Sequence, residues 1–342
     1  MCERTEVERV NGKWMLPAAL VCFLVACGGE LRGAISLRLS PQGYSPITKT
    51  LLIHSAEKDS NEGPMCLMTY DEVSGSLRRV ASPGRLGPVD WAWVPGRAAF
   101  IGVDLEQVLL FQKDMSGDGY TATAIPGLDS GLLPLQCSWS PTGQWLAVNC
   151  LSRANGARGE LWLYRFGDKA LRKTGVALDH GAIIWQDDAL FYGTKNNAVQ
   201  IVKLIGEKPS VVRTVPVSGR LAIFYGMFSE EPLFLSSGMI KHGDYKILGF
   251  LDRPSAKFRV IGTEKIIFVS ASPGHLAAFG TAGNQITTSD PGRLIRFGSV
   301  KDPNTVYGLA ESSLVCVSVE EGALKVRTIA DLGSLTGTEE QR

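Results

Sequence analysis

Short apolar strands recur along this chain behind a shared opening pattern. Residues 139–148 read Trp-Ser-Pro-Thr-Gly-Gln-Trp-Leu-Ala-Val, which is an aromatic residue, a tight turn and an apolar strand. The pattern repeats at intervals of 46 residues or slightly fewer, and its copies begin at Trp93, Trp139, Trp185, Phe228, Ala271 and Ala310. A repeat of about 40 to 45 residues that holds four short strands predicts one blade of a β-propeller.

The strand that follows each turn is the clearest element of the repeat. These apolar strands are predicted at residues 98–101, 146–148, 189–192, 233–235, 276–279 and 314–317. We interpret them as the innermost strands of their blades. Because they are almost purely apolar, they offer few groups for catalysis at a central funnel.

The blade count follows from the length of the repeating region. Residues 48–335 have room for seven units, so we expect an all-β, seven-bladed β-propeller with four-stranded blades. Six blades would result if the segment before Trp93, which lacks a recognisable anchor, were irregular. Within the linker at 27–47, residues 35–39 alternate apolar and polar side chains and could complete the last blade, because an open ring leaves strand edges exposed. The polar tail at 336–342 is expected to be mobile.

The best copy of the repeat resembles a known motif. Residues 139–148 are similar to the Trp-Ser-Pro-Asp-Gly-x-x-Leu-Ala-Phe segment of TolB-type propeller repeats, with Thr142 where that family usually has Asp. Residues 271–279 keep Ser-Pro-Gly and the apolar strand, and the overall rhythm is WD-like. The resemblance implies the propeller fold and, from TolB-type relatives, a role as an interaction hub of the bacterial envelope. It does not carry an activity, since such repeats host unrelated functions.

Composition narrows the class of protein. The chain is 44% hydrophobic and 20% charged, as expected for a globular protein, and its 38 glycines suit a fold rich in tight turns. The 35 basic and 34 acidic residues are spread along the chain. No basic stripe is present, so we do not expect a nucleic-acid partner, and we expect a monomer.

The N-terminal segment predicts export. Residues 15–26 are apolar but shorter than the roughly 20 residues that span a bilayer, which suits a secretory signal. Leu-Val-Ala-Cys at 24–27 resembles a bacterial lipobox. That resemblance implies a lipoprotein signal peptide at 1–26, acyl chains on Cys27 and a membrane-anchored protein facing the periplasm or the cell surface. The alternatives are an ordinary signal peptide or a buried apolar segment, with Cys27 incidental.

Residues 114–120 are the sharpest candidate for a metal site. Asp114, Ser116 and Asp118 place oxygen atoms at alternate positions before Gly119, as in the calcium loops of integrin-type propellers that they resemble. The acidic ligand expected later is missing, because Ile125 occupies the twelfth position. Asp-Gly is also a favoured hairpin turn, so calcium is the one cofactor considered and a plain turn is the alternative.

Cysteines and histidines provide the remaining candidates. Cys137 and Cys150 flank the turn at 141–143 and could form a disulfide in an oxidising envelope, or remain free buried thiols. Four histidines fall in different predicted blades, and they could converge on the axis or lie at the surface: His54, His180, His242 and His275.

Two functional classes remain open. The first is a non-catalytic binding or scaffolding module for an envelope protein or glycan, with Trp91 or Trp145 either anchoring a partner or packing between blades. The second is an enzyme, a lyase, lactonase or sugar-directed hydrolase, with its site at the central funnel. No Gly-x-Ser-x-Gly elbow is present. The apolar innermost strands predicted above favour binding.

Overall fold

The computed structural model places strands throughout the part of the chain that it describes, with no α-helix there. The described residues are 36–56, 66–80, 90–104, 106–114, 119–152, 159–179, 183–217, 221–228, 230–236, 239–243, 245–246, 258–272, 274–280 and 284–332. Within them no helix is long and apolar enough to cross a membrane. The predicted signal peptide, Cys27 and the C-terminal tail lie outside these residues.

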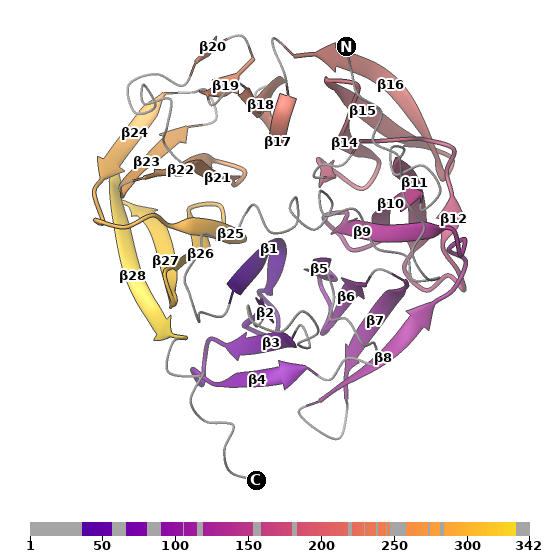
Figure 1. Cartoon of the computed structure of the whole chain (residues 1–342), viewed down its shortest axis with the longest axis horizontal. Coiled ribbons are helices and arrows are strands. Elements are labelled where there is room, and N and C mark those ends of the chain that lie inside the picture. The colour runs from indigo at the N-terminus through magenta and orange to yellow at the C-terminus, as the bar shows by residue number, and fades with distance from the viewer. Residues whose placement is uncertain are drawn as a thin grey trace, which may run out of the picture.

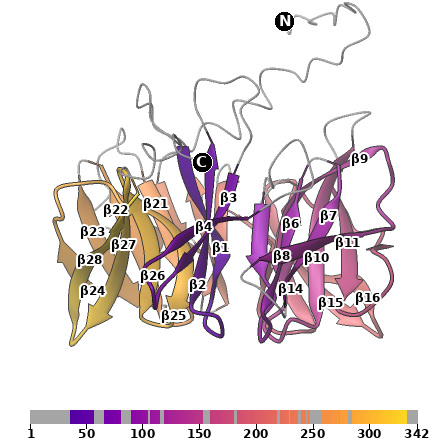
Figure 2. The ribbon, with the colours of Figure 1, turned by 90° about the horizontal axis from the view of Figure 1, so that it is seen from below.

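Seven antiparallel four-stranded sheets form a ring, which confirms the seven-bladed β-propeller and excludes six blades (Figure 1). Each sheet consists of four consecutive strands, the first near the axis and the fourth at the rim. Seen edge-on, the strands run from one face of the ring to the other (Figure 2).

The blades are contiguous in sequence. In chain order their strands are β1 (Ser36–Ser45), β2 (Thr50–Ala56), β3 (Cys66–Asp71) and β4 (Leu77–Val80); β5 (Asp90–Trp93), β6 (Ala99–Val103), β7 (Val108–Lys113) and β8 (Tyr120–Ile125); β9 (Leu132–Trp139), β10 (Trp145–Ser152), β11 (Gly159–Arg165) and β12 (Arg172–Lys173); β13 (Ile184–Trp185), β14 (Leu190–Lys195), β15 (Ala198–Ile205) and β16 (Lys208–Pro216); β17 (Leu221–Phe228), β18 (Glu231–Ser236), β19 (Met239–His242) and β20 (Tyr245–Lys246); β21 (Phe258–Gly262), β22 (Ile266–Ala271), β23 (His275–Gly280) and β24 (Gln285–Ser289); β25 (Arg296–Asp302), β26 (Thr305–Ala310), β27 (Ser313–Glu320) and β28 (Ala323–Asp331).

The repeat anchor occupies one register position, opposite the second residue of each blade's second strand. Trp139, for example, pairs with Leu146. Tyr44 holds this position in the first blade, where the sequence revealed no anchor. From the first blade to the last, the seven residues are Tyr44, Trp93, Trp139, Trp185, Met227, Gly262 and Val300.

Two of the predicted anchors are on the wrong strand. Ala271 and Ala310 end β22 and β26, which are second strands, and Phe228 lies one residue beyond the anchor position. The reason is that an apolar strand followed by a tight turn also describes the hairpin between second and third strands. The apolar strands predicted as innermost are accordingly second strands in blades two to five and third strands in the last two blades.

The ring closes by packing rather than by sharing a strand. The strand predicted at 35–39 falls within β1, which pairs with β2 in the first blade and not with the last blade as expected. β1 lies against β25 of the last blade (Figure 1). There Leu39 covers Gly298 so closely that a Cβ at position 298 would lie 2.0 Å from that of Leu39. An ion pair between Lys301 and Glu72 adds a second link between the two blades.

Buried side chains join neighbouring blades. Each of six apolar clusters draws its residues from two blades that are neighbours in the ring, and the cluster between blades two and three contains the fully buried Trp139. Trp91 and Trp145 are 1% and 6% exposed and belong to two other clusters. Of the two alternatives for these tryptophans, packing between blades is therefore the one that is confirmed.

Candidate binding site on the propeller axis

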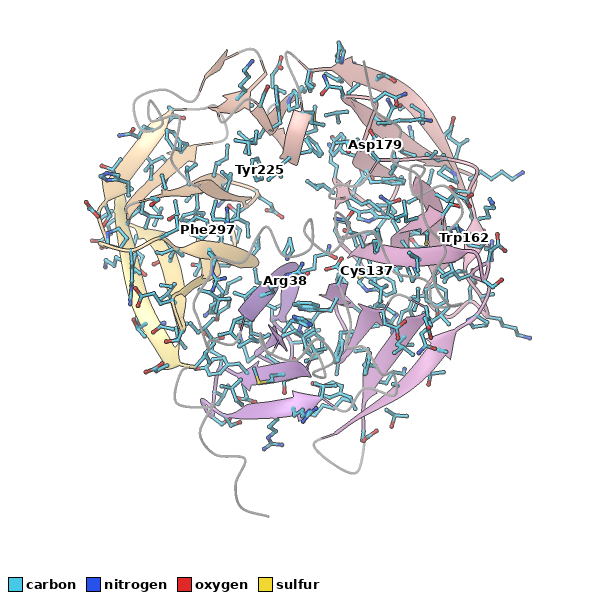
Figure 3. The ribbon with its side chains drawn as sticks, viewed as in Figure 1. Arg38, Cys137, Trp162, Asp179, Tyr225 and Phe297 are labelled. Atoms are coloured by element: carbon cyan, nitrogen blue, oxygen red, sulfur yellow. The ribbon has the colours of Figure 1, made fainter. Side chains whose placement is uncertain are left out.

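A layer of polar side chains lies around the axis at one register position. We call it the channel position. It is held by the residue of the first strand that pairs with the fifth residue of the second strand. In the six blades where this pairing is described, its occupants are Arg38, Asp90, Gln136, Ile223, Arg259 and Arg296. Five of the six are polar and partly exposed. Figure 3 shows Arg38 at the inner edge of its blade.

Among the six described members of the layer, Asp90 is the one with a carboxyl group. Its Oδ2 accepts a hydrogen bond of 2.9 Å from the backbone N–H of Cys137 in the next blade. Burial raises the pKa of Asp90 to about 6, although that N–H and the positive charge of Arg38 favour the ionised form. Asp90 therefore links two blades while its pKa lies close to neutral pH.

Two arginines of the layer act on each other across neighbouring blades. Arg259 occupies the channel position on β21. Arg296 occupies the same position on β25, the neighbouring first strand. Burial lowers the pKa of Arg296, and the positive charge of Arg259 lowers it further. The fold thus holds two like charges close together in a partly buried setting.

Directly outward from Arg38, His54 is buried on β2. The two residues pair across the strands, and the imidazole stacks on Trp91 with ring centroids 5.1 Å apart. Burial lowers the pKa of His54 to about 4, and Arg38 contributes to the shift. At neutral pH, His54 is therefore an uncharged aromatic side chain on the strand next to Arg38.

The predicted calcium ligands are only partly described. Asp114 follows β7, its backbone N–H bonds to the carbonyl of Gly119, and its carboxylate accepts a hydrogen bond from Thr121. Ser116 and Asp118 lie outside the described residues. Within the residues that the structure does describe, no group of three or more His, Cys, Asp or Glu side chains could hold a metal ion. Calcium binding at Asp114, Ser116 and Asp118 stays a prediction.

The two cysteines considered for a disulfide are free, buried thiols. Cys137 pairs with Val148, and Cys150 pairs with Pro134, so the cysteines are diagonal neighbours across β9 and β10. Diagonal Cβ atoms lie about 7 Å apart, whereas a disulfide needs about 4 Å. Register therefore explains why these two cysteines are free thiols, the other alternative drawn from the sequence.

The histidines do not converge. His54 is on a second strand, and His242 and His275 are on third strands, away from the axis. His180 lies outside the described residues. The alternative that the histidines converge on the axis is therefore wrong for the three that are described.

Sequence reasoning missed the polar layer because it assigned the wrong strands to the axis. A signal was present, since Asp90 and Gln136 each stand three residues before a tryptophan anchor. Arg259 stands three residues before Gly262, but an anchor of glycine is invisible in the sequence.

The chain matches no family model and no curated protein. Solved structures share its fold. It is 9% identical to the Cps50 (Swd1) β-propeller domain of Myceliophteria thermophila, over 87% of this chain and 100% of that one, with a TM-score of 0.52. A chain of a mitotic checkpoint complex is 12% identical, over 73% of this chain and 83% of that one, with a TM-score of 0.52.

An enzyme is also among these similar structures. Puromycin hydrolase is 12% identical, over 86% of this chain and 57% of that one, with a TM-score of 0.58. At such identities the likeness concerns fold alone. The fold is that of a WD40-like β-propeller, which both components of protein complexes and enzymes adopt.

Proposed function

We propose that this protein is a lipid-anchored β-propeller of the bacterial cell envelope that works as a binding or scaffolding module for an envelope protein or glycan. The polar channel layer carries the proposal. Its guanidinium and amide groups are recognition groups, because the arginine fork pairs with oxyanions and glutamine both donates and accepts hydrogen bonds. They surround the axis of a ring in which each sheet is packed against its neighbours.

The membrane attachment is argued from the sequence Leu-Val-Ala-Cys at 24–27. Eight residues lie between Cys27 and Ser36, the first residue of β1. The nine residue-to-residue steps from Cys27 to Ser36 reach about 30 Å when extended, so an acylated Cys27 would hold the face at which β1 begins toward the bilayer. The turns that join first to second strands lie on the opposite face and would point away from it.

Mass spectrometry of the full-length protein from bacterial membranes tests the attachment. We expect a mature chain that starts at Cys27 with acyl chains on that residue, and we expect Cys27→Ser to leave the membrane fraction. An unprocessed leader on the wild-type protein contradicts the attachment.

Affinity capture from envelope extracts tests the binding role. The full-length protein should recover a partner whose yield falls when Arg38 is changed to Gln. Arg213→Gln is the matched control, because Arg213 is exposed on the rim strand β16. Equal recovery with all three proteins contradicts a binding role for the channel layer.

A hydrolytic enzyme is the second candidate, and one observation favours it. Asp90 is a carboxyl group on the axis whose pKa is raised to about 6, as suits a general acid or base near neutral pH. Assays on lactones and glycosides test this function. Turnover by the wild-type protein that Asp90→Asn abolishes would establish the enzyme over the binding module.

A further inference from the structure

We propose that a cavity between the fourth and fifth blades binds a lysine or arginine side chain of a protein partner, whose charged group pairs with the carboxylate of Glu231. None of the residues that line the cavity belongs to the channel layer, so the proposal goes beyond the binding role given above and does not depend on the lipid anchor. Three observations support it: apolar walls, the size of the cavity and the carboxylate that lines it.

Packing within the ring leaves the boundary between the fourth and fifth blades incompletely filled. The six apolar clusters join six of the seven pairs of neighbouring blades, and within the residues that the structure describes no such cluster joins these two. A cavity of about 70 Å³ lies there, between the end of β16 and the start of β18. Figure 1 shows these two strands on adjacent blades. The cavity offers room for a group from outside the chain.

Alternation along β18 sets the wall that the fifth blade contributes. Leu233 and Leu235 pack in the apolar cluster shared with the sixth blade. Pro232 and Phe234 alternate with them along the strand and so face the fourth blade. Both line the cavity, and Phe234 is fully buried. This wall is therefore apolar.

The wall from the fourth blade follows from the register of β15 and β16. Val202 packs toward the third blade, so Val199, three residues before it on β15, faces the fifth blade. Val215 of β16 pairs with Val199 and shares its face. Residues 215–217, which read Val-Pro-Val, line the cavity. Both walls are thus built from apolar side chains.

Glu231 is the one charged residue that lines the cavity. A Cβ at position 243 would collide with its carboxylate, and Gly243, with a φ of +58°, leaves that space open. The N–H of Gly243 donates to the carbonyl of Pro232 at 2.8 Å, which holds the turn after β19 against β18. Among the described residues, none forms a hydrogen bond or an ion pair with the Glu231 carboxylate. The carboxylate is therefore placed at the cavity with its charge unpaired.

Size and chemistry together favour a basic side chain. A water-sized group takes up about 10 to 15 Å³ of such a cavity, so 70 Å³ holds about five of them, which is the size of a lysine side chain. The hydrocarbon stem of lysine or arginine packs on apolar surface while its charged head stays accessible. An acidic side chain would meet Glu231 as a like charge.

Ligand-observed saturation-transfer NMR on the purified full-length protein tests the site. The probes are capped tripeptides with a central lysine, arginine, norleucine or glutamate between two alanines. We expect saturable binding of the lysine or the arginine peptide, with the strongest transfer to its side-chain methylenes. Norleucine keeps the stem without the charge and should bind about five-fold more weakly, which is the effect of one exposed ion pair. The better of the two basic peptides identifies the residue of the partner.

Charge variants test the role of Glu231. Glu231→Gln should weaken binding of the basic peptide about five-fold, to the level of the norleucine peptide. Glu264→Gln is the matched control, because Glu264 is an exposed glutamate in the turn between the first and second strands of the next blade. It should bind as the wild type does. Both positions are exposed, so the melting temperature should stay unchanged in both variants.

A filled cavity provides the second test. Val215→Phe should abolish binding of the basic and the norleucine peptides, because the larger ring occupies the space between the walls. Val211→Phe is its control, since Val211 is exposed on the same strand and pairs with Val202, on the face toward the third blade. The melting temperature shows whether each variant is folded.

Four results overturn the proposal: no saturable binding of either basic peptide, equal binding of the glutamate peptide, equal weakening by Glu231→Gln and Glu264→Gln, or undiminished binding by a folded Val215→Phe. The outcomes also separate this site from the channel layer. If partner capture depends on Arg38 while the basic peptides do not bind, the binding module stands and the cavity site fails. If the peptides bind through Glu231 while capture is independent of Arg38, the cavity site stands alone.

Discussion

Gln42 pairs its side-chain amide with both backbone polar groups of Trp139, 97 residues further along the chain. Nε2 donates to the Trp139 carbonyl at 2.8 Å, and Oε1 accepts from the Trp139 N–H at 2.8 Å. Gln42 is part of an irregular stretch of β1 between Leu39 and Tyr44, where the register with β2 shifts. The amide thereby connects the first blade to the third and satisfies backbone groups at the end of β9.

Replacing Gln42 by Ala should lower stability by about 1 to 3 kcal/mol, because two partly buried backbone groups lose their partners. The urea midpoint of unfolding measures the change. Gln112→Ala, at an exposed position of β7, is the matched control and should stay within about 0.5 kcal/mol of the wild type. Equal effects of the two substitutions would contradict the role of Gln42.

Gly298→Ala should destabilise the seam between the first and last blades by about 1 to 3 kcal/mol, since the added methyl would overlap Leu39. Leu39→Gly in the same chain, which removes the Cβ that the added methyl would meet, should recover part of the loss, and this coupling is measured by a double-mutant cycle. Gly131→Ala is the control, because a Cβ there meets nothing within 4 Å. Additive effects of the two seam substitutions would count against direct contact.

The free energy of unfolding should decrease in acid, because protonation of the buried His54 is unfavourable in the folded protein. Its pKa is about 4 in the folded protein and near 6.5 when unfolded, so its contribution is complete above pH 6.5 and is lost as the pH falls toward 4. The shift corresponds to about 3 kcal/mol. Asp90 acts in the opposite sense, because its raised pKa costs stability as the pH rises from about 4 to 6.

The variant His54→Phe separates the pH-dependent contribution of His54 from that of Asp90. It keeps an aromatic ring against Trp91 and removes the imidazole that titrates. Urea unfolding at pH 7, 5.5 and 4.5 should show that this variant loses less stability toward acid than the wild type. His275→Gln removes a half-exposed histidine instead and should follow the wild-type profile. Parallel profiles for the wild type and His54→Phe would show that His54 does not set the acid response.

Thr142→Asp should destabilise the protein by about 1 kcal/mol, although it restores the residue that TolB-type repeats usually have. In this chain the Thr142 hydroxyl donates to Asp188 Oδ2 at 2.5 Å and the Thr142 N–H donates to Oδ1 at 3.2 Å. A carboxylate at position 142 would face that of Asp188. Adding Asp188→Asn should restore the melting temperature, and failure to do so would argue against this charge pair.

Local pattern predicted the blade and its best hairpin. The turn after Trp139 needs a positive φ at Gly143, which is +71°, and Ser140 accepts the N–H of Trp145. These are short-range requirements that a ten-residue window contains. They also explain why Ala271 was assigned to the wrong strand. The hairpin after Ala271 likewise has an apolar strand and a tight turn, but it connects a second strand to a third.

The channel layer could not be predicted in this way. Arg38, Arg259 and Arg296 become neighbours only when the ring is closed and the innermost strands are known. The contact between Gln42 and Trp139 likewise follows from tertiary packing. Sequence spacing within one blade contains no information on the channel layer or on the contact between Gln42 and Trp139.

Contiguous blades also bear on how such a ring changes during evolution. Because no sheet borrows a strand from the opposite end of the chain, a single in-frame duplication or deletion of about 45 residues adds or removes one whole sheet. Rings of different blade number are therefore close neighbours in sequence space for a protein built in this way.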